Sequence, residues 1–350
     1  MSGSVSPGFP MPRVVAAPMA GGTSSTAFVS ASLDAGALAF MAGGYLSAES
    51  LGKQLLEVRN GAAVKEGAAF GVNLFVPEES APERAAVERY AEALQPWAER
   101  LGVEVPLPRY DDDDDYPAKI RLLLEHPVPL LSFTFGLPDQ ETAEALHKRG
   151  TLLWATVTHR AELDAALGLG MDGVVLQHRN AGGHSGRFLP GPAPEAASVQ
   201  DLVRELRPHC AVTLVAAGGI ATPTEAAAAL EAGADAVQLG TALLRSPESG
   251  ARQLHKDALA DARFTRTQTT RAFTGRAARA LVNDFVREYD AQAPEAYPTV
   301  HHLTAPLRAA AARRGEADGL NLWAGTAWEQ ATTEAVGDII ARFRAATRSD

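Results

Sequence analysis

The chain has 350 residues, a formal net charge of −10 and a single cysteine, Cys210. A chain of this length buries about three quarters of its unfolded surface, which is enough for a large enzyme core. The acidic excess argues against a nucleic-acid partner. One cysteine excludes an internal disulfide and favours a reducing compartment, the cytoplasm. No apolar segment approaches the roughly 20 residues that span a membrane, and we expect neither a signal peptide nor a membrane partner.

Eight short apolar runs alternate with helical patterns from residue 13 to about residue 255. Continuous apolar runs are typical of parallel strands that are covered on both faces. Eight strand–helix units predict an α/β fold, a (β/α)₈ TIM barrel, which commonly takes about 250 residues. The expected strands cover residues 13–17, 37–42, 69–75, 130–135, 152–156, 173–177, 213–217 and 236–239.

The chain is longer than the barrel needs. We expect residues 1–255 to form the barrel, with an insertion at about 102–117, and residues 256–350 to form a mainly helical lobe over the barrel mouth. The insertion carries five consecutive aspartates, 111–115. A block of like charges is more often a solvated loop than a cation site, so we predict no metal there.

An internal repeat supports the barrel. Residues 166–174 and 229–237 match in register, each as a helix end, a glycine and a strand entry. Asp172 and Asp235 occupy the same place, at the bottom of the barrel, where residues usually serve stability. We interpret both as structural. The GxGxxG spelling at 168–173 precedes a strand instead of following one, which is the reverse of the dinucleotide fingerprint, so we reject it.

The strand at 173–177 ends in a glycine-rich loop that carries His184. Glycines let backbone amides approach a ligand closely. A histidine in such a loop can touch that ligand, and its unperturbed pKa lies near ~6.5. His184 is therefore the candidate catalytic residue, as a base or as a hydrogen-bond donor.

Glycine turns also follow the last two expected strands, at Gly218-Gly219 and Gly240-Thr241. In TIM barrels these two loops frequently bind phosphate. Backbone N–H groups at a helix start attract an anion without a charged side chain. Because both loops carry the signal, a phosphate-bearing cofactor is favoured over simple tight turns.

Taken together, the motifs resemble those of the nitronate monooxygenase (2-nitropropane dioxygenase-like) family of FMN-dependent TIM barrels. The resemblance covers nearly the whole chain, and its two C-terminal stretches resemble the bacterial branch that acts on nitronates. The stretches are 17–22 (APMAGG), 70–76 (FGVNLFV), 132–138 (SFTFGLP), 181–186 (AGGHSG), 217–220 (AGGI), 238–241 (QLGT), 303–308 (LTAPLR) and 322–325 (LWAG).

This resemblance implies an FMN enzyme in which His184 is the catalytic histidine. It implies oxidation of alkyl nitronates, with nitroalkanes as further candidates, by O₂ to a carbonyl compound and nitrite. The partners would be a small anionic substrate and O₂, and the protein a monomer or homodimer. The implied FMN contacts are Met19, Asn73, Gln177, Gly182, Gly183, Gly218, Gly219, Gln238, Leu239, Gly240 and Thr241.

Three positions depart from the family pattern. Asn180 stands where glutamate is usual, His178 where glycine is usual, and Thr134 where histidine is common. If that second histidine helps to bind the substrate anion, affinity or specificity changes here, and His178 is a candidate replacement. Tyr289 and Tyr297 are candidates to line the substrate pocket.

Three other interpretations stay open. A flavin-dependent NAD(P)H reductase, acting on enoyl-acyl-carrier protein or quinone, shares the barrel and the AGGH loop, but the long C-terminal lobe and the acidity argue against it. An IMP dehydrogenase-like barrel needs a cysteine in its active loop, whereas Cys210 precedes the seventh expected strand. A non-catalytic flavin-binding protein is disfavoured by His184 and left open by Thr134 and Asn180.

Overall fold

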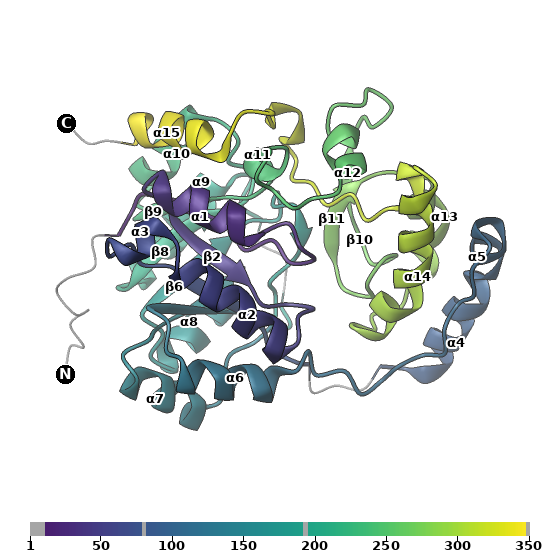
Figure 1. Cartoon of the computed structure of the whole chain (residues 1–350), viewed down its shortest axis with the longest axis horizontal. Helices are drawn as coiled ribbons and strands as arrows, with labels where there is room; N and C mark the ends of the chain where they lie inside the picture. The colour runs from purple at the N-terminus through teal and green to yellow at the C-terminus, as the bar shows by residue number, and fades with distance from the viewer. Residues whose placement is uncertain (1–10, 79–81, 192–194, 348–350) are drawn as a thin grey trace.

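The computed structural model describes residues 11–78, 82–191 and 195–347. Eight parallel strands close into a barrel, which confirms the predicted fold (Figure 1). Each expected strand agrees with the observed one to within two residues at either end. The strands, in their order around the barrel, are β1 (Val14–Ala16), β2 (Leu38–Ala42), β3 (Gly71–Phe75), β4 (Leu130–Thr134), β5 (Leu152–Val157), β6 (Gly173–Gln177), β8 (Thr213–Ala217) and β9 (Ala236–Leu239).

Side chains alternate along these strands between the barrel interior and the surrounding helices. The interior is filled by a small apolar cluster that includes Phe40, Trp154 and Val215, so the barrel is a packed core and not a pore. A larger apolar cluster lies between the strands and the helices. Because successive side chains point to opposite faces, Val175 fills the interior while Gln177, two residues later, lies on the same face at the barrel mouth.

Helices surround the barrel, and most of the longer ones begin at a residue whose side chain accepts a backbone N–H. Ser25, Ser47, Asp139 and Ser198 act in this way, and Thr222 forms a capping box with its N3 residue. The barrel helices are α1 (Thr26–Asp34), α2 (Ala48–Arg59), α3 (Ala62–Lys65), α6 (Tyr116–Glu125), α7 (Gln140–Lys148), α8 (Arg160–Gly168), α9 (Val199–Leu206), α10 (Pro223–Glu231), α11 (Thr241–Leu244) and α15 (Val336–Ala346), with a 3₁₀ turn η1 (Arg207–His209).

The lobe has its own aromatic core, in which Trp97, Phe273, Phe285 and Tyr289 pack edge-to-face or stacked. A small antiparallel sheet in the order β10-β11-β7 joins the lobe to the barrel loop that carries His184. The lobe and this sheet together contain α4 (Arg84–Ala93), α5 (Gln95–Leu101), α12 (Gln253–Ala258), β10 (Thr267–Thr270), β11 (Ala278–Leu281), α13 (Asp284–Tyr289), α14 (Thr299–Arg313), the barrel-loop strand β7 (Gly183–His184) and the 3₁₀ turns η2 (Asp290–Gln292), η3 (Ala317–Gly319) and η4 (Trp328–Gln330).

The packing of helices α4, α5 and α15 suggests boundaries for the lobe that differ from the expected ones. The segment after β3 leaves the barrel well before residue 102, and its helices α4 and α5 pack against α14 (Figure 1). The hydroxyl of Tyr90 in α4 donates to the carbonyl of Ala272 at 2.6 Å. In turn, α15 packs against α1 and α10 of the barrel. We therefore assign α4 and α5 to the lobe and α15 to the barrel.

The aspartate run at 111–115 is only in part the solvated loop that its charge predicted: Asp111 and Asp113 are exposed, whereas the other three contact distant parts of the protein. Asp114 accepts the Tyr45 N–H at 2.7 Å and forms an ion pair with the buried Lys119 at 2.8 Å. Asp115 accepts the N–H of Ala48, at the start of α2, at 2.7 Å. Asp112 pairs with a lobe histidine, His302, at 2.5 Å. The run is a strap between barrel and lobe, because its partners are distant in the sequence.

The two repeated aspartates lie at the bottom of the barrel, as predicted. Asp235 accepts the Leu214 N–H at 2.8 Å and its own N–H donates to the Leu214 carbonyl at 2.8 Å. Asp172 forms the same pair of bonds with Leu153. Each aspartate thus ties its strand to the preceding one. The GxGxxG spelling spans the end of α8 and the start of β6. This helix-then-strand order is the reverse of that in a dinucleotide-binding fingerprint.

We expect Asp235→Ala to lower the free energy of unfolding by about 1–3 kcal/mol, because the N–H of the buried Leu214 loses its acceptor. Asp235→Asn is the control. It keeps an acceptor and loses only the half-exposed ion pair with Arg207, which is worth less than about 1 kcal/mol. Urea unfolding measures both variants. Equal stability of Asp235→Ala and the wild type would show that this contact is dispensable.

Candidate active site

A cavity of about 300 Å³ lies at the carboxyl ends of the barrel strands, between the barrel and the lobe. This is within the usual size of small-molecule sites, and the carboxyl end is where TIM barrels place their active sites. Eleven of the twelve predicted site residues line it: Met19, Asn73, Gln177, Gly182, Gly183, His184, Gly218, Gly219, Gln238, Gly240 and Thr241.

Leu239, predicted as an FMN contact, is the exception and is not among the residues that line the cavity. Its side chain is fully buried in the apolar cluster between the strands and the helices. The alternation along β9 explains this position: Gln238 faces the barrel mouth, so the next residue must face the opposite way.

His184 is fixed by both parts of the protein. It lies in β7, which pairs with β11 of the lobe. Its Nε2 is 3.0 Å from the hydroxyl of Thr274, and its ring packs against Phe135, Tyr297 and Trp323 with centroids 5.3–5.7 Å away. Burial, and then the charge of Arg308, lower its pKa to about 3. The imidazole is therefore neutral at neutral pH.

The Thr274 hydrogen bonds indicate which nitrogen of His184 is protonated. The Thr274 hydroxyl donates to the carbonyl of Arg276 at 3.3 Å and accepts the Arg276 N–H at 3.4 Å, so its second lone pair can accept the Nε2–H of His184. This arrangement leaves Nδ1 with the free lone pair. Thr274 comes from the RAFTGRAAR segment at 271–279.

The loop that carries His184 is braced from below by Gln177. Its Nε2 donates to the His184 carbonyl at 3.1 Å, and its Oε1 accepts the Gly186 N–H at 2.7 Å. Gln177 thus lines the cavity and also holds the backbone of the loop that carries His184. Both ends of its amide are engaged with protein.

The two glycine turns also line the cavity. Gly218 and Gly219 have φ of +99° and +80°, which only glycine adopts readily. A Cβ at Gly182 would lie 2.5 Å from the backbone nitrogen of Gly325. The Gly325 N–H in turn donates to the hydroxyl of Thr241 at 3.0 Å. The glycines therefore let the barrel loops and segment 321–326 of the lobe approach each other closely.

Two buried polar atoms of the cavity wall, Gln238 Oε1 and the Tyr45 hydroxyl, have no hydrogen bond among the described residues. Of the two, Gln238 Oε1 can only accept. A buried acceptor without a donor is costly, about 1–3 kcal/mol, and such groups call for an explanation. A ligand N–H in the cavity would satisfy it.

The structure places the residues that depart from the family pattern. Thr134 lines the cavity, where its hydroxyl accepts the Asn73 Nδ2–H at 3.0 Å and lies 3.2 Å from the Thr156 hydroxyl. Asn180 borders the turn, since a Cβ on Gly219 would lie 3.1 Å from its side chain. Neither position provides a charge.

His178 was the candidate to replace the histidine that is common in the family at the position of Thr134, but the structure excludes this. It is 1% exposed and lies outside the cavity. Its Nε2 bonds to the Ala196 carbonyl at 3.0 Å, and its Nδ1 accepts the Asn180 N–H at 3.3 Å. Burial lowers its pKa. The sequence could not fix the direction of this side chain.

Of the two tyrosine candidates, Tyr289 belongs to the lobe core and not to the cavity. Tyr297 packs beside the His184 ring, with centroids 5.7 Å apart, but it is not among the residues that line the cavity either.

Several cavity residues were not predicted from the sequence. His301 and Arg308 lie two turns apart on one face of α14, and Tyr45 follows β2 with a φ of 65°. Their signals were a polar stripe on an otherwise apolar helix and a position just beyond a strand end. The other lining residues without a sequence-based role include Arg252, His255, Asn321 and Trp323.

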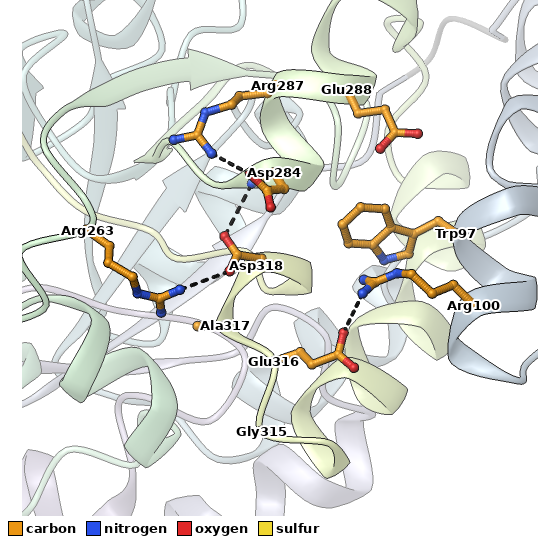
Figure 2. A pocket seen from close by; sticks show the side chains of 10 residues that line it. All are labelled: Trp97, Arg100, Arg263, Asp284, Arg287, Glu288, Gly315, Glu316, Ala317 and Asp318. Carbon is orange, nitrogen blue, oxygen red and sulfur yellow. Dashed lines mark hydrogen bonds and ion pairs between the residues drawn. The ribbon is translucent and has the colours of Figure 1, made fainter.

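A second hollow lies in the lobe surface beside α5 and α13 (Figure 2). Ion pairs cross it, among them Arg100–Glu316 at 2.9 Å and Arg263–Asp318 at 3.3 Å. Because these charges are already paired with one another, the hollow offers no catalytic candidate. Among the residues that the structure describes, no group of three or more His, Cys, Asp and Glu side chains is placed to hold a metal ion, and none of the described helices is long and apolar enough to cross a membrane.

Comparisons with known proteins agree with this geometry. The family profile described as Nitronate monooxygenase matches residues 8–344. A probable nitronate monooxygenase from Staphylococcus saprophyticus is 34% identical, with 89% of this chain and 88% of that protein covered. One from Staphylococcus aureus is 32% identical, with 94% and 92% covered.

Among solved structures, a nitroalkane oxidase from Streptomyces ansochromogenes has a TM-score of 0.90 and 43% identity, covering 97% of this chain and 96% of that one. FabK from Thermotoga maritima has a TM-score of 0.73 at 22% identity, covering 96% and 93%, and shares the fold.

We predict that the folded protein loses stability at acidic pH, because three histidines of the cavity are neutral. Burial is the main cause that lowers the pKa of His184 to about 3, of His255 to about 4 and of His301 to about 2. In the unfolded chain histidine titrates near ~6.5. Below that pH the unfolded chain binds more protons than the folded protein, so stability is full above ~6.5 and falls as pH drops toward 4.

At pH 5 each of these histidines should reduce the free energy of unfolding by up to about 2 kcal/mol relative to pH 7. Urea unfolding at both pH values measures the loss. His255→Gln keeps a donor for the Trp323 carbonyl, which His255 Nε2 contacts at 2.9 Å, and should lose less stability. Equal stability of the wild type at pH 7 and pH 5 would contradict the buried neutral state.

Proposed function

The chain belongs to the nitronate monooxygenase family, and from this premise we propose that it uses FMN and O₂ to oxidise alkyl nitronates to a carbonyl compound and nitrite. The observation that carries the proposal is one cavity in which the neutral His184 and the cation of Arg308 lie together with two glycine turns. The structural neighbour from Streptomyces is a nitroalkane oxidase, so we include nitroalkanes as a second substrate class.

The cavity residues fit FMN. The consecutive left-handed glycines 218 and 219 and the turn at Gly240-Thr241 suit one terminal phosphate. Gln238 Oε1 is a buried acceptor without a donor in the protein, and the N–H of the isoalloxazine ring could donate to it. Met19, Asn73 and the backbone of 182–183 complete the proposed contacts. When bound, FMN would take electrons from the substrate and pass them to oxygen.

His184 has different roles with the two substrate classes. Its Nε2–H is held by Thr274, so Nδ1 is the atom that can take a proton. A neutral nitroalkane must lose its α-proton before oxidation, and Nδ1 can accept it. A nitronate has already lost that proton, so with this substrate His184 only orients and contacts the anion.

A flavin-dependent reductase is the second candidate. The neighbours that would support it share only the fold at 22% identity. Among the described residues, the one GxGxxG spelling does not follow a strand, so no second nucleotide site is indicated. We therefore propose that NADH and NADPH are not substrates.

The experiment is oxygen uptake and nitrite release with ethylnitronate and propionate 3-nitronate, run beside NADH and NADPH oxidation with a quinone or an enoyl thioester. We expect nitrite with the nitronates and no consumption of reduced nicotinamide. NADH-dependent activity without nitronate turnover would reject the proposal in favour of a reductase.

Acid treatment of the purified protein should release FMN and not FAD. Gly219→Val should lower the FMN content, because a side chain there meets Asn180 at 3.1 Å in a left-handed backbone conformation. Gly168→Val is the control, since nothing lies within 4 Å of a Cβ at that position. Released FAD, or full FMN content in Gly219→Val, would contradict the assignment of the turn.

His184→Ala should keep FMN and lose about 10² to 10⁴ in rate with nitroethane, the usual loss for one acid–base group. The loss with ethylnitronate should be smaller, because no proton is removed from it. Thr274→Val should lose about 10 to 100-fold with nitroethane through misorientation of His184, whereas Thr274→Ser keeps the hydroxyl and should stay near wild type.

Steady-state kinetics with both substrates checks this assignment. Wild-type activity of His184→Ala on nitroethane would show that His184 is structural. Equal losses in the valine and serine variants would show that the Thr274 hydroxyl does not position it.

A further inference from the structure

The cavity holds an arginine whose charge no carboxylate balances. Arg308 projects from α14 and lines the cavity. Its hydrogen-bond partners are neutral: the His301 carbonyl at 3.0 Å, His301 Nδ1 at 3.2 Å, the Thr304 hydroxyl at 3.2 Å and Asn321 Oδ1 at 3.5 Å. Among the described residues, no Asp or Glu oxygen lies within 4.0 Å of its guanidinium.

The rest of the cavity wall does not supply the missing negative charge. No aspartate or glutamate is among its lining residues, although the chain has a net charge of −10. Burial raises the pKa of Tyr45 to about 12, so its phenol stays neutral. The other lining arginine, Arg252, adds positive charge. By contrast, Arg276, buried nearby, is paired with Glu78.

Burial lowers the pKa of Arg308 to about 10, so it stays protonated at neutral pH. Desolvating a cation without a counter-charge is unfavourable. A protein that keeps such a cation facing a cavity is organised for an anionic ligand there.

Two anions could meet this charge: the cofactor phosphate or the substrate. The glycine turns that suit a phosphate follow β8 and β9 of the barrel, whereas Arg308 comes from the lobe and acts electrostatically on His184 and His301. The substrate therefore fits the position better. The guanidinium is also planar, with a fork of five N–H donors, and its four hydrogen bonds to protein leave at least one donor for a ligand oxygen.

We propose that Arg308 binds the nitronate oxygens beside His184 and makes the enzyme select the anionic nitronate over the neutral nitroalkane. This inference rests on the proposed function. His301 is the positioning residue: its ring stacks on Tyr45 at 4.3 Å, and its carbonyl and Nδ1 hold one end of the guanidinium. The fork is thus oriented before the substrate arrives.

The test uses the FMN-loaded enzyme with Arg308→Met and Arg308→Lys. Arg313→Met is the matched control, because it makes the same change on an exposed position of the same helix. Two quantities are measured: KM and kcat with ethylnitronate and with nitroethane, and the affinity for nitrate, a planar oxyanion, from the change in flavin absorbance.

We expect Arg308→Met to raise the KM for ethylnitronate and the Kd for nitrate by at least about tenfold, with a much smaller change in the KM for nitroethane. Arg308→Lys, which keeps the charge without the fork, should fall between. Arg313→Met should behave like wild type. If Arg308→Met does not fold, Arg308→Lys decides by the same two quantities.

Unchanged nitrate affinity and ethylnitronate KM in the Arg308 variants would overturn the inference. Loss of FMN from these variants would also overturn it, by assigning the cation to the phosphate. If the wild type binds nitrate through Arg308 yet turns over no nitronate, the anion site is supported while the proposed function fails.

Discussion

The closure of the lobe over the barrel mouth is the constraint on which the site depends. It buries His184, Tyr45 and Arg308 in one cavity, and burial then sets their protonation. The histidine loses its charge, the phenol cannot ionise, and the arginine alone stays charged at neutral pH. A cavity with a neutral base, lining arginines and no lining carboxylate suits a substrate that is an anion or becomes one when it loses a proton.

This closure is built from contacts between residues far apart in the chain. Gly182 and Gly325 bring two backbones together at a distance that no side chain permits. The pairing of β7 with β11 carries Thr274 to His184, ninety residues earlier in the sequence. The aspartate strap, through the Asp112–His302 pair, fixes the same junction from the other side. The barrel alone would supply the glycine turns but neither the partner of His184 nor the cation.

The sequence predicted the barrel well because each strand is an apolar run of the right length between turn signals, and most cavity residues because they follow strand ends. The sequence does not reveal features that depend on side-chain direction or on distant partners. Leu239 faces the helices since Gln238 faces the mouth, and the charge of the run at 111–115 said nothing of its partners in α14 and α6. Arg308 was missed because α14 reaches the cavity only through the tertiary packing of the lobe.

We propose that FMN bound in the cavity accepts electrons from nitronates. The most direct test is anaerobic mixing of the FMN-loaded protein with ethylnitronate while the flavin absorbance is followed. We expect ethylnitronate to bleach the absorbance band of the oxidised flavin at least as fast as the enzyme turns over. NADH at the same concentration should leave this band unchanged. Bleaching by NADH with no response to ethylnitronate would contradict the account and assign the cavity to a reductase.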